Sequence, residues 1–88
     1  MEIVSNKFNL EVKDLTGKRR TKNIASARHI AMYLCREITA LSYPEIGRLF
    51  GGRDHSTAIH AYKCVEKKSK ESEEYKSEVN YLRASIKN

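Results

Sequence analysis

Several features that mark other classes of protein are missing from this sequence of 88 residues. It has no apolar run long enough to cross a bilayer, and no hydrophobic segment after a charged N-terminus that would act as a signal peptide. We therefore expect a cytoplasmic protein without a membrane span. Its two cysteines, Cys35 and Cys64, lack the C-x-x-C spacing of a metal or redox pair, and each falls where a helix could bury it. We expect both to be reduced thiols.

The alternation of apolar and polar residues that marks β-strands is also absent, as are repeats, low-complexity segments and linkers. A chain of this length can build one small domain around one modest core. We predict a single all-α domain over residues 1–88.

The charge is strongly unbalanced. Lysine and arginine number 17 against 11 aspartates and glutamates, which gives a net charge of +6. An excess of this kind predicts a polyanionic partner, whether DNA, RNA or an acidic membrane surface. Solubility alone would explain the same charge equally well, so the partner has to be argued from motifs.

Residues 42–63, SYPEIGRLFGGRDHSTAIHAYK, have the pattern of two helices joined by a tight turn. Ser42 and Glu45 have the spacing of a capping box, and Gly51-Gly52 can take the positive φ with which a helix ends. Asp54 can cap the second helix. Five consecutive polar residues stand at its beginning: Arg53, Asp54, His55, Ser56 and Thr57. This is the layout of a helix-turn-helix, in which the start of the second helix contacts base edges.

The flanking segments complete a helical fold. Helical periodicity predicts short turns near residues 1–9 and 12–15, a long scaffold helix over residues 24–39 and a last helix from residue 72, so about six helices in all. A basic loop precedes the scaffold helix, and its cations are Lys18, Arg19, Arg20 and Lys22. Such a loop is often only a solvated surface. Here it has no acid of its own and leads into a helix that carries further cations, Arg28 among them.

Nothing in the sequence points to an enzyme. Asp54-His55-Ser56 contains the residue types of a catalytic triad, but three consecutive helical residues cannot converge on one substrate. His55 and His60 are five residues apart and do not share a helical face, as zinc ligands one turn apart would. A DNA-binding role explains these residues better than a catalytic one. Asp54 can accept a hydrogen bond from a cytosine amine, and the Thr57 methyl can touch a thymine methyl. A well-capped helix start explains any one of these residues, but not five together.

With these residues the sequence resembles a known family. IGRLFGGRDHSTAIHAYKCVEK, residues 46–67, is similar to the signature of the C-terminal DNA-binding domain of the bacterial replication initiator family DnaA. The similarity extends to Lys18-Arg19-Arg20, to Ala25-Ser26-Ala27-Arg28 and to Ser42-Tyr43-Pro44-Glu45 at consistent spacing. It therefore covers almost the whole chain.

The resemblance implies a Trp-repressor-like helical fold that binds double-stranded DNA at short, asymmetric, A·T-rich sites called DnaA boxes. It implies that the second helix of the pair enters the major groove while the basic loop places Arg20 in the adjacent minor groove. The implied major-groove group is Arg28, Asp54, His55, Ser56 and Thr57. The implied backbone contacts, which position the protein without reading sequence, are Lys18, Arg19, Lys22, Arg53 and Lys63. No cofactor or metal is implied, and the location would be the nucleoid.

Four positions depart from the family pattern. Ala27 stands where proline is often found, Ser26 where arginine is, His29 where glutamine is common, and Ser56 where threonine would add a methyl group. The contacts at these positions are therefore left open.

Other hypotheses also stay open. The family's initiators carry an ATPase module before this domain, so we expect an excised domain rather than a free-standing DnaA-like regulator. A module that docks regulatory proteins, or a repressor-like regulator that binds as a dimer, would also suit a basic helical domain. The separate basic loop and the lack of an obvious dimerisation helix favour a monomer on an asymmetric site.

Overall fold

The computed structural model describes residues 22–87, together with residues 13, 15 and 17. This part contains four α-helices and no β-strand: α3 (Lys22–Ile38), α4 (Tyr43–Leu49), α5 (His55–Glu71) and α6 (Glu73–Lys87). The all-α prediction is confirmed for these residues. The helix expected over residues 1–9 lies outside the described part, whereas Lys13 and Leu15 are helical as predicted. The total number of helices and the Trp-repressor-like topology stay predictions.

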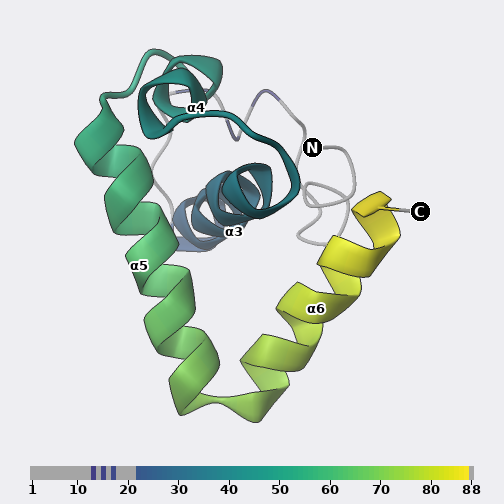
Figure 1. Ribbon diagram of the computed structural model, residues 1–88. Helices are drawn as coiled ribbons and strands as arrows, with labels where there is room; N and C mark the ends of the chain where they lie inside the picture. The colour runs from purple at the N-terminus through teal and green to yellow at the C-terminus, as the bar shows by residue number, and fades with distance from the viewer. Residues whose placement is uncertain (1–12, 14, 16, 18–21, 88) are drawn as a thin grey trace.

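The scaffold helix α3 lies at the centre of the domain, between α5 and α6 (Figure 1). Its apolar stripe is buried as the periodicity predicts, since Ala27, Ile30, Ala31 and Leu34 are each at most 2% exposed. The second helix of the pair, α5, packs mainly against α3 and α4. The helix-turn-helix is therefore held by the same core that α3 organises.

The two glycines and the capping box set the limits of α4. The Glu45 N–H donates to the Ser42 hydroxyl oxygen at 3.3 Å, and the Ser42 N–H donates to the Glu45 carboxylate at 3.1 Å. These two bonds satisfy donors that a helix start leaves unpaired. Gly51 and Gly52 follow with φ of 89° and 76°, a conformation that costs other residues energy. Both sequence predictions are confirmed.

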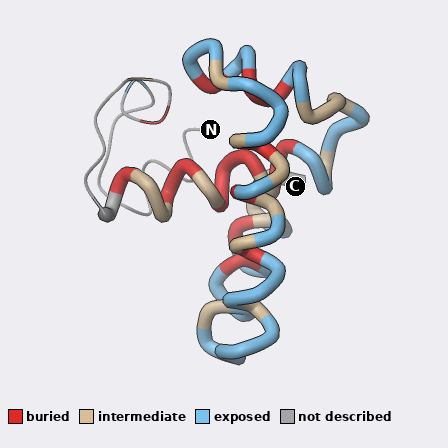
Figure 2. Tube along the Cα trace, turned by 90° about the vertical axis from the view of Figure 1, so that its left-hand side faces the viewer, coloured by how far each residue is buried: buried red, intermediate tan, exposed pale blue. Residues whose placement is uncertain are grey.

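The last helix, α6, diverges from α5 after a single intervening residue, Ser72 (Figure 1). Exposed residues gather where α5 passes into α6, so this end projects from the core (Figure 2). Arg83 ties α6 to α3, because its Nη2 donates to the Tyr33 hydroxyl at 3.0 Å and to a Glu37 carboxylate oxygen at 3.2 Å. The other Glu37 oxygen accepts a 2.7 Å bond from the Tyr62 hydroxyl, which raises the pKa of Tyr62.

Candidate nucleic-acid interface

Asp54 fixes the start of α5. Its Oδ1 accepts bonds from the N–H and the hydroxyl of Thr57, both at 3.0 Å. These bonds, the backbone one first, lower the pKa of the Asp54 carboxyl. The predicted cap is therefore confirmed, and the Thr57 hydroxyl belongs to it. His55 and Ser56 are exposed on the same first turn; the base contacts expected of all four residues stay predictions.

Asp54→Asn is expected to make the fold less sensitive to acid. A carboxyl whose pKa is lower in the folded than in the unfolded chain stabilises the fold above its unfolded pKa, and that stabilisation is lost as pH falls through the folded pKa. With an ordinary aspartate pKa near 3.9, the loss lies below about pH 5. Asparagine keeps the cap without titrating, so the melting temperature should fall less steeply in acid.

The measurement is thermal melting across the acid range. Asp54→Ala serves as the control, because it removes the cap together with the charge and should be less stable at neutral pH as well. An unchanged acid slope in Asp54→Asn would contradict the stabilising role of the ionised cap.

Arg28, on α3, is a buried cation with 6% of its surface exposed. Its Nε donates to the Leu15 carbonyl at 2.7 Å, and its Nη2 donates to the Gly17 carbonyl at 3.1 Å. Hydrogen bonds of this kind offset the cost of removing a charge from water. The base contact implied for Arg28 stays a prediction. What the structure establishes is a contact with the chain that leads into the basic loop.

Arg53 lies in the turn between α4 and α5 and reaches the same place. Its Nη2 donates to the Gly17 carbonyl at 2.6 Å, and its Nη1 donates to the Phe50 carbonyl at the end of α4. Its backbone N–H donates to the Gly47 carbonyl at 2.8 Å. These bonds direct the guanidinium toward the protein. The phosphate contact implied for Arg53 stays a prediction.

A hollow of about 390 Å³ connects the first half of α3 to the first turn of α5. Its lining residues are Ala25, Arg28, His29, Met32, Arg53 and Thr57. Three residues of the candidate interface thus meet in one place: Arg28, Arg53 and Thr57. Two guanidinium groups beside a helix N-terminus give this hollow a positive character, which suits a phosphate backbone.

His29, whose contacts the sequence left open, also lines this hollow. Its ring meets that of His60 edge-on, with 5.7 Å between the centroids. Burial lowers the pKa of His29, and the neighbouring His60 lowers it further. A lowered pKa favours the neutral ring, which can accept a hydrogen bond as well as donate one. Its position directly after Arg28, at the start of the scaffold helix, was the signal in the sequence.

The remaining candidates are the basic-loop residues and Lys63. Lys18, Arg19 and Arg20 lie outside the described residues, and Lys22 is described only as the first residue of α3. Lys63 is exposed on α5, seven residues after Ser56. Residues seven apart share a helical face, so Lys63 lies on the side of α5 that carries Ser56.

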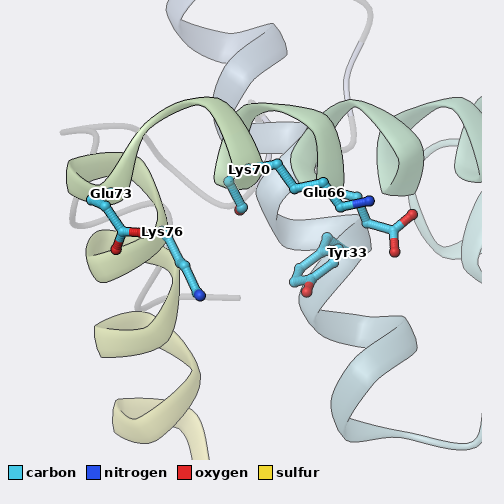
Figure 3. A pocket seen from close by; sticks show the side chains of 6 residues that line it. Tyr33, Glu66, Lys70, Glu73 and Lys76 are labelled. Carbon is cyan, nitrogen blue, oxygen red and sulfur yellow. The ribbon is translucent and has the colours of Figure 1, made fainter.

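A second hollow, of about 430 Å³, lies at the other end of α5, against α3 and α6 (Figure 3). Figure 3 shows side chains of both charges around it, with Glu66 and Lys70 on α5 and Glu73 and Lys76 on α6. Charges of both signs cancel at a distance, so this hollow does not attract a polyanion as the first one would.

No cluster of three or more His, Cys, Asp or Glu side chains that could hold a metal is found among the residues that the structure describes. Within the same residues, no helix is long and apolar enough to cross a membrane. Cys35 is buried and Cys64 half-buried, and both are free thiols, as the sequence predicts.

Two comparisons with known proteins agree with this geometry. A family model described as "Bacterial dnaA protein helix-turn-helix" matches residues 1–65. A solved structure described as the crystal structure of a DNA replication initiation factor is similar with a TM-score of 0.85 and 39% sequence identity. The similarity covers 96% of this chain but only 26% of that chain. The present chain therefore corresponds to a minor part of the length of that protein.

Proposed function

The chain belongs to the bacterial DnaA helix-turn-helix family, and on that premise we propose that it binds double-stranded DNA in support of replication initiation. The sites are short, asymmetric and A·T-rich, and one monomer occupies each. The first turn of α5 enters the major groove, while Arg20 of the basic loop reads the adjacent minor groove. The family is a DNA-binding rather than a catalytic one, so the chain is proposed to have no enzymatic activity and to need no cofactor.

The exposed first turn of α5, capped by Asp54 and flanked by a cation-lined hollow, carries this proposal. His55 and Ser56 project there as polar groups that can bond base edges. Their helix is held by α3 and α4, so a rigid surface presents them. Lys63 is exposed on the side of α5 that carries Ser56, and its ammonium group can contact the DNA backbone. We place the protein at the nucleoid, where regulatory proteins can compete for this surface.

Selection of bound duplexes from a random pool tests the proposal. An asymmetric A·T-rich motif should be enriched. A palindromic motif would instead favour a repressor-like dimer, and sedimentation on a single-site duplex would show which stoichiometry holds. A protein-docking module would be favoured if no motif were enriched and if the chain captured an acidic protein equally well with and without the Arg20→Ala and His55→Ala substitutions.

His55→Ala and Arg20→Ala are each expected to weaken binding to the enriched duplex by about 1–3 kcal/mol. Both residues are proposed to contact bases, so the loss on a shuffled duplex should be much smaller. Titration of the two duplexes with each variant measures the difference. Equal losses on the two sequences would show that the residue does not read bases.

A further inference from the structure

Two arginine side chains from separate elements meet at one backbone oxygen. Arg53 Nη2 donates to the Gly17 carbonyl at 2.6 Å, and Arg28 Nη2 donates to the same oxygen at 3.1 Å. A carbonyl oxygen has two lone pairs and can accept both bonds. Each bond has a charged donor, which makes it stronger than a bond between neutral groups.

Arg53 is anchored at several points of the turn before α5. Its Nη1 donates to the Phe50 carbonyl, and its backbone N–H donates to the Gly47 carbonyl at 2.8 Å. The two arms of the guanidinium thus bridge the end of α4 and Gly17. A cation that served only to contact phosphate would direct these donors to solvent.

These bonds join Gly17 to the start of α5, across a sequence separation of 36 residues. Arg53 directly precedes Asp54, the N-cap of α5. The residue that bonds Gly17 and the residue that caps α5 are therefore neighbours in the sequence. Gly17 directly precedes the basic segment 18–22, and three residues of chain span at most about 11 Å. The bonds from Arg53 and Arg28 therefore fix, relative to the first turn of α5, the residue from which the basic segment starts.

We infer that Arg53 is a positioning residue: with Arg28 it holds Gly17 so that the basic segment and the first turn of α5 meet neighbouring grooves at a fixed separation. The inference rests on the proposed function, in which these two elements contact one duplex. It differs from the role that the family resemblance implies, because Arg53 acts through the basic segment rather than through a phosphate of its own.

The test is a double-mutant cycle between Arg53 and Arg20 on the enriched duplex. Arg53→Gln should weaken binding by about tenfold in the wild-type background, but by no more than about twofold in an Arg20→Ala background. The second loss is small because Arg20, the base contact of the segment that Arg53 positions, is already absent, and the phosphate contacts that the segment keeps do not depend on one exact register. Arg53→Lys should behave like Arg53→Gln, since lysine keeps the charge but cannot bridge two carbonyls with a rigid fork.

Arg48→Gln is the matched control, because it removes an exposed arginine from α4 of the same helix-turn-helix. Its effect should be equal in both backgrounds. Thermal melting identifies any variant that fails to fold. The carbonyl chemical shift of Gly17 in DNA-free protein should change in Arg53→Lys and stay unchanged in Arg48→Gln, which gives a readout independent of DNA.

The outcomes separate the inference from the function on which it rests. Equal losses from Arg53→Gln in both backgrounds, full binding by Arg53→Lys, or an unmoved Gly17 carbonyl shift would overturn the positioning role and leave DNA binding intact. No preference of the wild-type chain for the enriched duplex over a shuffled one would overturn the proposed function itself, and the inference with it.

Discussion

Gly47→Ala is expected to lower the free energy of unfolding by more than about 3 kcal/mol. Gly47 is buried in α4, where alanine by itself would favour the helix by about 1 kcal/mol. A Cβ at this position would lie 2.1 Å from the Arg53 carbonyl oxygen and 2.9 Å from that of Asp54. Both neighbours are backbone atoms, which cannot rotate away as a side chain can. α4 would have to separate from the turn that starts α5.

Gly52→Ala is the matched control for this prediction. Gly52 has a φ of 76°, but nothing lies within 4 Å of the place where a Cβ would be added. The cost there is conformational alone and should be about 1–2 kcal/mol. Denaturant unfolding of both variants measures the difference. A Gly47→Ala variant as stable as Gly52→Ala, or as the wild type, would show that α4 does not pack this closely on the turn.

Short-range patterns were sufficient to predict the elements and their caps. The capping box at Ser42 and Glu45, the stop at Gly51-Gly52 and the cap at Asp54 each depend on residues within one turn of one another. The apolar stripe of α3 follows from helical spacing in the same way. The existence of the helix-turn-helix and of its exposed polar first turn could therefore be read from the sequence.

Contacts between distant segments could not be predicted in this way. Arg28 lies off the apolar stripe of its helix, and its guanidinium donates to carbonyls of a segment 11 and 13 residues earlier. Helical spacing identifies the apolar face of a helix but not the distant backbone oxygen that lies opposite a given side chain. The same holds for Arg83, whose partner Tyr33 is 50 residues away. Roles that join two segments therefore became apparent only in the structure.

The affinity for DNA is expected to fall by a factor of roughly 150 between 50 and 200 mM monovalent salt. Each phosphate neutralised by a cation releases condensed counterions, and the logarithm of the binding constant falls by about 0.9 per contact for each tenfold rise in salt. The resemblance to the family implies five backbone contacts. If Arg53 positions the basic segment instead, four remain: Lys18, Arg19, Lys22 and Lys63. Four contacts give an expected slope of about −3.6. Five contacts would give a slope of about −4.5 and a loss of roughly 500-fold over the same range of salt.

Lys63→Gln sharpens this prediction, because Lys63 is exposed on the side of α5 that carries Ser56. The variant should reduce the slope by about 0.9 and should weaken enriched and shuffled duplexes alike, since phosphates carry no sequence information. Lys70→Gln removes the same charge from the far end of α5, at the hollow lined by both acids and bases, and should leave the slope unchanged. A slope shallower than about −1 would mean that the protein neutralises at most one phosphate, which would contradict the four contacts. Equal effects of the two lysine variants would mean that attraction to the whole basic domain, not a phosphate contact of Lys63, governs binding.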